Sequence, residues 1–287
     1  MTQIDEFESL FKSASKPVFH IEPVTVNRVM VVLDEAAPLS PEYVPSVMKF
    51  LSVLNNIEQD IETLIVTGEQ YHSVGNLLER IQDFEPDLVC TYRNLRIPAT
   101  EFPFSLGVFV DVLTQATSIP VLLLPRPDMV NGPEHVLTNT DRVMAVTDHL
   151  AGDSQLVTYA ALFTQDGGQL TLAHIEDEQT FDRLIDVIGK IPSIDTEPAR
   201  IAIRDQLLKE PADFIESCRM GIQQAGIPIE VESVVTMGHH LSDYRNLIRE
   251  SETDLLVFNT KDEDQLAMHG LAYPLSVEFR DLPLLLI

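Results

Sequence analysis

The sequence predicts an α/β protein made of two tandem open parallel-sheet sandwiches, the first copy being abridged. Three pairs of similar segments, in the same order in both halves, lead to this prediction. The pairs are NRVMVVLD (27–34) with DRVMAVTD (141–148), PDLVCTYR (86–93) with TDLLVFNT (253–260), and SLGVFVDVLTQATSIPVLLL (105–124) with MHGLAYPLSVEFRDLPLLLI (268–287). In the last pair a glycine precedes a proline by thirteen residues in both halves.

Apolar runs alternate with amphipathic segments in each half, which is typical of parallel strands joined by right-handed helical crossovers. The first half predicts strands at 29–33, 63–67, 88–92 and 121–124, and helices at 41–55, 73–84 and 104–117. The second half predicts strands at 142–147, 169–175, 229–235, 254–259 and 283–287, and helices at 153–164, 198–225, 242–251 and 270–279. The first half thus lacks one strand and one helix, and β-prone residues at alternating positions make 16–26 (KPVFHIEPVTV) a candidate for the missing strand.

These patterns divide the chain into an N-terminal extension (1–26), a first domain (27–125), a linker (126–140) and a second domain (141–287). The linker region 125–140 holds three prolines and one glycine and has little periodicity. In the extension, Ile4, Phe7, Leu10 and Phe11 have helical spacing, so this stretch either packs on the protein or docks on a partner.

The formal net charge is −26, and both halves are acidic: residues 1–140 hold 19 acidic and 8 basic residues, and residues 141–287 hold 26 and 11. Nucleic-acid binding requires Lys and Arg to neutralise phosphates, so it is not expected. The acidic start of the chain does not resemble a signal peptide, and no apolar run is long enough to span a membrane. We therefore expect a cytoplasmic protein.

The sequence gives little support for catalysis or metal binding. It contains no Gly-x-Ser-x-Gly elbow and no Walker lysine loop. His239 and His240 are adjacent, but no third ligand lies at a matching spacing, and His174 is expected to be a strand residue. Cys90 and Cys218 are expected to be buried, inert thiols.

The chain resembles the universal stress protein family, in its tandem form with two domains in one chain. The resemblance rests on the first strand that ends in Asp34 or Asp148, on His174 in LTLAHIED, and on the glycine, helix, proline and apolar strand that close each half. It implies the adenine nucleotide alpha hydrolase-like fold and a regulatory role in the stress response.

Nucleotide-binding members of that family carry, after the fourth strand, two glycines three residues apart and then a third glycine followed by Ser or Thr. Gly107 and Gly270 stand at the third position, but Val108 and Leu271 follow them. Asn94 and Ile97 stand where the first two glycines belong, and the shorter second loop carries Asp262, Glu263 and Asp264. These carboxylates would repel a triphosphate, so we expect no cofactor, with ATP or AMP as the alternative.

Six residues remain as candidates for a degenerate site: Asp34, Arg93, Arg96, Gly107, Asp148 and Gly270. The resemblance implies that the two aspartates contact a nucleotide, but a strand-end aspartate also bonds to nearby loop N–H groups. Arg93 and Arg96 either hold a small anion or monophosphate, or are surface residues paired with carboxylates.

The leading hypothesis is a regulatory or adaptor protein that associates with an unidentified protein partner and does not bind ATP; whether it is an enzyme stays open. The alternative is a nucleotide or small-anion sensor that uses one cleft. The resemblance also implies that Val121–Leu124 and Leu284–Ile287 pair within one chain, which would cover two apolar edges and make the chain a pseudo-dimer. A further homodimer is possible.

Overall fold

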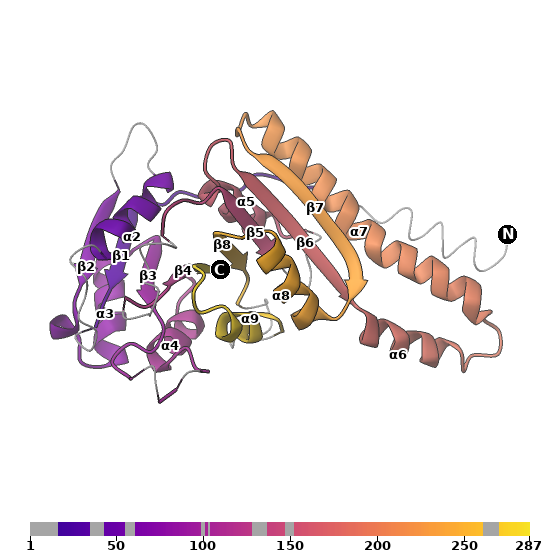
Figure 1. The fold of residues 1–287 in the computed structure, drawn as a ribbon, viewed down its shortest axis with the longest axis horizontal. Coiled ribbons are helices and arrows are strands. Elements are labelled where there is room, and N and C mark those ends of the chain that lie inside the picture. Colours follow the sequence, from indigo (N-terminus) through magenta and orange to yellow (C-terminus); the bar gives the residue numbers. More distant parts are fainter. Residues whose placement is uncertain are drawn as a thin grey trace.

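The computed structural model describes residues 17–34, 43–54, 61–98, 101–102, 104–127, 137–146, 152–260 and 270–287. It contains one nine-stranded sheet in the order β2-β1-β3-β4-β9-β8-β5-β6-β7, with helices packed against it (Figure 1). All neighbouring strands are parallel except β4 and β9. The predicted α/β class with parallel strands is confirmed. No helix in this described part combines the length and the apolar composition that a membrane span needs.

The N-terminal half contributes four strands, and β1 and β3 lie at its centre. Its β3 and β4 are buried at every position because neighbouring strands and helices enclose them. The elements are β1 (Arg28–Val32), α2 (Tyr43–Leu51), η1 (Ser52–Leu54), β2 (Glu62–Val66), η2 (Gly68–Gln70), α3 (Val74–Phe84), β3 (Leu88–Tyr92), α4 (Val108–Ala116) and β4 (Val121–Leu124).

The C-terminal half contributes five strands, and its β6 and β7 are the longest of the sheet. A helix that the sequence did not predict, α6, follows β6 directly because Asp177 caps it by accepting hydrogen bonds from Gln179 N (2.7 Å) and Thr180 N (3.2 Å). The elements are β5 (Arg142–Val146), α5 (Ser154–Phe163), β6 (Gln169–Asp177), α6 (Glu178–Ile188), α7 (Thr196–Gln224), β7 (Glu230–Gly238), α8 (His240–Glu250), β8 (Leu255–Phe258), α9 (Ala272–Glu278) and β9 (Leu284–Leu286).

The two halves join through antiparallel pairing of β4 with β9. Leu122 lies opposite Leu285, and both side chains are fully buried. The expected pairing of the two closing strands inside one chain is therefore confirmed. Because every other pair is parallel, the carboxyl ends of the strands in one half point opposite to those in the other half.

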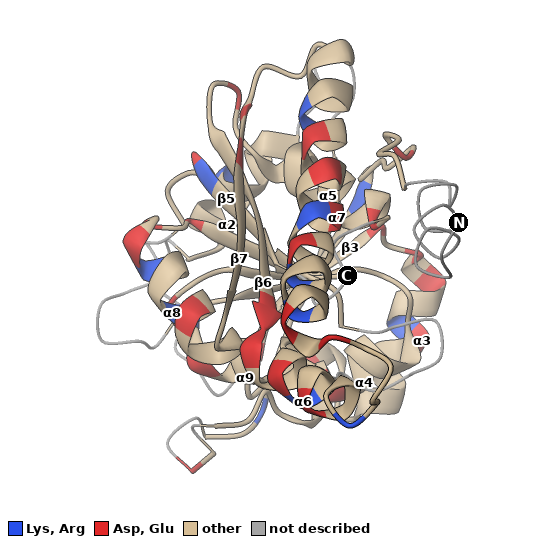
Figure 2. Ribbon diagram, turned by 90° about the vertical axis from the view of Figure 1, so that its right-hand side faces the viewer, with Lys and Arg blue, Asp and Glu red and all other residues tan. Residues whose placement is uncertain are grey.

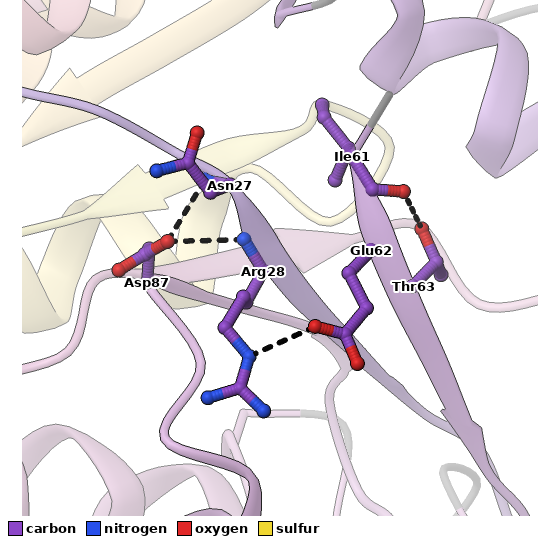
Figure 3. A network of polar contacts seen from close by, with 6 residues as sticks. All are labelled: Asn27, Arg28, Ile61, Glu62, Thr63 and Asp87. Carbon is purple, nitrogen blue, oxygen red and sulfur yellow. Dashed lines mark hydrogen bonds and ion pairs between the residues drawn. The ribbon is translucent and has the colours of Figure 1, made fainter. Parts of the chain in front are cut away.

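One polar contact recurs at the start of the central strand in both halves. In the N-terminal half, the Asp87 carboxylate accepts hydrogen bonds from Asn27 N (2.8 Å) and Arg28 N (3.0 Å), and Arg28 forms an ion pair with Glu62 (Figure 3). In the C-terminal half, Asp254 accepts a hydrogen bond from Arg142 N at 2.9 Å. These aspartates occupy the same position in the matched segments PDLVCTYR and TDLLVFNT.

The expectation that 16–26 replaces the missing strand is wrong for its described part, residues 17–26, which form no strand. This segment crosses to the C-terminal half, where Phe19 N donates to Ser217 Oγ (3.0 Å) and His20 N to Ser154 Oγ (3.3 Å). The Phe19 ring is buried and packs so closely on α7 that only a glycine fits at Gly221. Hydroxyl groups of Ser217, Ser154 and Thr158 on the helices thus accept hydrogen bonds from the backbone of this segment. The alternation of apolar residues in the sequence could not reveal these contacts.

Replacing Phe19 with Ala should lower the free energy of unfolding by about 3 kcal/mol, since a buried aromatic ring is lost and a cavity remains. Ile21→Ala is the matched control, because Ile21 is 43% exposed in the same segment and should change stability by less than about 1 kcal/mol. Urea unfolding followed by circular dichroism measures both. Equal effects would contradict the packing of Phe19 against α7.

Deleting Leu284–Ile287 should yield aggregated protein, because β4 and β8 would then expose apolar edges that β9 covers in the full chain. The soluble fraction and gel filtration of the truncated chain measure this. A soluble truncate that unfolds cooperatively would show that the β4–β9 pairing is dispensable.

Candidate functional site

Asp34, directly after β1, is buried and bonded within the protein. Its Oδ1 accepts a hydrogen bond from the Tyr92 hydroxyl (3.1 Å), and its Oδ2 accepts one from the Arg96 backbone N–H (2.7 Å). The Asp34 N–H in turn donates to the Tyr92 hydroxyl oxygen at 2.9 Å. The carboxylate therefore organises the loop after β3, as expected for a strand-end aspartate that bonds to loop N–H groups.

Arg96 turns its side chain back toward the protein. Its Nη1 donates to the carbonyl oxygens of Gly68 (2.7 Å) and Tyr71 (2.9 Å), and its guanidinium lies 5.5 Å from the centre of the Tyr71 ring. The backbone of Arg96 is left-handed (φ 61°), which aims its N–H at Asp34. Arg96 and Asp34 thus belong to one network, and among the described residues the Arg96 side chain donates to main-chain carbonyl oxygens.

Arg93 points to the other half of the molecule. Its Nη2 donates to the carbonyl oxygens of Ser276 (2.9 Å) and Phe279 (3.0 Å), at the C-terminal end of α9. Only 4% of Arg93 is exposed, and its Nε and Nη1 have no hydrogen-bond partner among the described residues. Burial, and then the charge of Arg280, lower the pKa of Arg93 to about 10, while Asp281 opposes the shift. Arg93 and Arg96 therefore do not converge on one anion.

Two residues that sequence reasoning missed complete this network. The buried Arg126, from the predicted linker, donates through Nη1 to the carbonyl oxygens of Arg93 (3.0 Å) and Asn94 (2.9 Å). The Tyr92 hydroxyl bonds to Asp34. Burial is the main cause that raises the pKa of Tyr92, so its hydroxyl stays protonated and donates. A tyrosine at the end of an otherwise apolar strand is the signal that could have indicated Tyr92. Nothing local marks Arg126, because its partners are carbonyls distant in sequence.

Gly107 has a structural reason to be glycine. Its φ is +88°, and a Cβ there would lie 2.9 Å from the Asn94 Cα. Asn94 N also donates to Leu106 O at 2.7 Å, which holds the two loops together. Gly270, before α9, likewise has a positive φ of 54°. Close approach of two backbones therefore accounts for Gly107 without any ligand.

The C-terminal half is described only in part at the equivalent edge of the sheet. Asp148 and the loop Lys261–His269 lie outside the described residues. At the described part of this edge, Asp153 caps α5 by accepting from Leu156 N (2.9 Å) and also accepts from the Asn259 amide. Thr260 donates through N and Oγ1 to the Ile287 carbonyl oxygen.

A hollow of about 260 Å³ opens at this edge, between the two halves. The matched segments align Thr260, at this edge, with Arg93 at the corresponding edge of the N-terminal half. Arg93 reaches the last turn of α9, whereas Thr260 bonds to Ile287 and lines the hollow beside the last turn of α4. Hydroxyl and amide groups on an apolar floor line this space: Thr114, Thr117, Ser118, Ile119, Val121, Gln155, Asn259, Thr260, Leu286 and Ile287.

The other residues noted in the sequence form no reactive constellation in the described part of the chain. His239 and His240 line a hollow of about 350 Å³ together with Asp177, near the acidic residues that gather where β6 runs into α6 (Figure 2). No group of three His, Cys, Asp or Glu that could hold a metal is found among the described residues. Cys90 and Cys218 are buried, as expected, and burial raises the pKa of both thiols, that of Cys218 to about 12.

No family model and no curated protein matches the sequence. Among solved structures, a functionally unknown protein from Pseudomonas aeruginosa PAO1 aligns over 91% of this chain and 92% of its own, at 11% identity and a TM-score of 0.48. A universal stress protein from Archaeoglobus fulgidus aligns over 92% of this chain and 88% of its own, at 16% identity and a TM-score of 0.46. The functional conclusion therefore depends on the contacts within this chain.

Gly107→Ala should lower the free energy of unfolding by about 3 kcal/mol, since the new Cβ combines an unfavourable φ with a backbone clash. Gly226→Ala is the matched control: its φ is +73°, but no atom lies within 4 Å of the added Cβ, so about 1 kcal/mol is expected. Urea unfolding of both variants measures the difference. Equal losses would mean that the Asn94 contact does not constrain Gly107.

Proposed function

We propose that this protein is a cytoplasmic regulator or adaptor of the universal stress type, which acts by associating with a protein partner and does not bind ATP. The chain is proposed to consist of two tandem copies of one domain whose ATP-binding loops are degenerate. Its domains are those bounded at 27–125 and 141–287. The repeated Asp87 and Asp254 contacts support the duplication, because the same hydrogen bond fixes the same strand in each copy.

The occupied carboxylate of Asp34 is the observation that carries this proposal. Asp34 is only 3% exposed, so a nucleotide could reach its carboxylate only if the Tyr92 hydroxyl or the loop that carries the Arg96 N–H moved away. Breaking contacts to a buried charge costs about 2 kcal/mol or more for each hydrogen bond. The arginines also offer little to a phosphate, since Arg93, Arg96 and Arg126 donate to carbonyl oxygens, and the two unbonded nitrogens of Arg93 are buried.

A sensor of a small molecule is the second candidate function, and the hollow of about 260 Å³ at the C-terminal half favours it. Its described lining carries hydroxyl and amide groups and no basic side chain, so it suits an uncharged ligand better than a phosphate. Thermal-shift measurement on a small-molecule panel tests this function. Thr260→Arg should remove any shift that a ligand in the hollow causes, because it introduces here the side chain that Arg93 supplies in the other half.

Isothermal titration with ATP, ADP and AMP tests the proposed lack of nucleotide binding. We expect no heat beyond dilution at ligand concentrations of about 1 mM, because Asp34 is satisfied within the protein and the glycines of the phosphate loop are missing. A thermal shift with the same nucleotides checks the result, since a ligand at a hundred times its Kd adds about 2.7 kcal/mol of stability. Stoichiometric binding at micromolar concentration would overturn the proposal.

A further inference from the structure

Four large apolar side chains lie exposed where the loop before α4 meets α9. The exposed fractions are 52% for Phe102, 69% for Phe104, 49% for Val108 and 40% for Tyr273. The Tyr273 hydroxyl lies 3.5 Å from the Phe104 carbonyl oxygen, and the Arg280 guanidinium lies 4.9 Å from the centre of the Phe104 ring. We call these five residues the α4–α9 patch.

The composition of the patch is that of a protein-binding surface. Aromatic residues and arginine are enriched at protein interfaces and dominate their binding energies, whereas isolated exposed apolar residues need no explanation. Here Arg280 lies over the Phe104 ring, and the Tyr273 hydroxyl bonds to the main chain of Phe104, so that aromatic and arginine side chains from both halves lie together. The patch exists only because the two halves are joined.

The protein holds the patch in place from behind. Arg93 ties the loop after β3 to the carbonyl oxygens of Ser276 and Phe279 in the last turn of α9. Asn94 donates through its side chain to Phe102 O (3.2 Å) and through its backbone to Leu106 O (2.7 Å). A surface fixed in this way loses little conformational entropy on binding.

Charge indicates what kind of segment would bind. The guanidinium of Arg280 is partly exposed and, among the described residues, forms no hydrogen bond or ion pair, whereas Arg28, Arg142 and Arg200 each pair with a carboxylate. Arg93 lies close enough for its pKa to be lowered by the charge of Arg280. Glu101 and Asp281 adjoin the patch along the chain, but the N–H groups of Arg280 remain available for a bidentate contact with a carboxylate.

We propose that the α4–α9 patch binds a partner segment that places large apolar side chains beside a carboxylate. The apolar side chains would cover Phe104 and Tyr273, and the carboxylate would pair with Arg280. This inference rests on the proposed function and names the surface and the chemistry of the partner. The patch includes Val108, which stands where the family carries a phosphate-bonding hydroxyl, so a protein segment would dock beside the former ligand edge.

Fluorescence anisotropy with the full chain tests the proposal, using as probe a labelled amphipathic peptide of Leu, Phe and Glu. We expect micromolar binding, a loss of roughly tenfold or more for Phe104→Ser, and no change for Ile201→Ser, an equally exposed apolar residue (61%) on α7. Arg280→Gln should weaken binding of this peptide but not of a peptide with Gln in place of Glu. Circular dichroism confirms that the exposed-site variants stay folded.

Three outcomes would overturn the proposal: no binding at millimolar peptide, equal binding to Phe104→Ser, or tighter binding of a peptide with Lys in place of Glu. A dimer in sedimentation experiments that Phe104→Ser dissociates would assign the patch to a second copy of the chain instead. The nucleotide titration separates this test from the proposed function. If neither the peptide nor a nucleotide binds, the proposal for the patch is wrong and the adaptor proposal stands. If a nucleotide binds, the adaptor proposal is wrong.

Discussion

The antiparallel pairing of β4 with β9 is the constraint on which the rest of the molecule depends. It joins two sets of parallel strands with opposite directions into one sheet, so the carboxyl edge of each half lies beside the amino edge of the other. The end of β3 is thereby placed at the C-terminal end of α9, and the end of β8 beside the last turn of α4. The end of β3 and the end of β8 are therefore each bordered by a helix of the other half.

The two borders carry different side chains at matched positions. Arg93 and Thr260 align in the matched segments PDLVCTYR and TDLLVFNT, after the strands β3 and β8. Arg93 is long enough to reach the α9 carbonyls, where its positive charge meets the negative end of the helix. Thr260 bonds to the Ile287 carbonyl oxygen and lines the hollow. The two borders thus differ in that Arg93 forms a contact between the halves, whereas Thr260 lies beside an open space.

Much of the fold could be predicted from the sequence because it depends on local periodicity and on matched segments. The β4–β9 pairing followed from the family resemblance, and VLLL and LLLI supplied the apolar strands that it requires. The segment after Lys16 was misassigned since alternating apolar residues also fit an extended chain that lies on helices. Helix α6 was missed because its start depends on Asp177, a residue at the end of a strand.

The candidate site was harder to predict, because residue identity does not show which partner a side chain takes. Arg93 and Arg96 are three positions apart, and the sequence left open whether they hold an anion or pair with carboxylates. Positive φ angles at Asn94 and Arg96 turn the chain, and the two side chains reach different carbonyl oxygens. Arg126 was assigned to a linker, although its guanidinium holds the loop. Such contacts join residues far apart in sequence and can be found only in three dimensions.

The glycine at 107 can be explained by packing of the backbone alone. A phosphate loop and a tight crossing of two backbones both require a residue without Cβ, so Gly107 alone cannot distinguish them. The residues around Gly107 favour the backbone crossing. Asn94 fills the space next to Gly107, Val108 has no hydroxyl, and Arg93 donates to carbonyl oxygens of α9. The same loop leaves Phe102 and Phe104 exposed, where covering them with another protein would remove apolar surface from water. The close approach of two backbones therefore explains Gly107 in the described part of the N-terminal half, and the loop beside it presents exposed aromatic side chains.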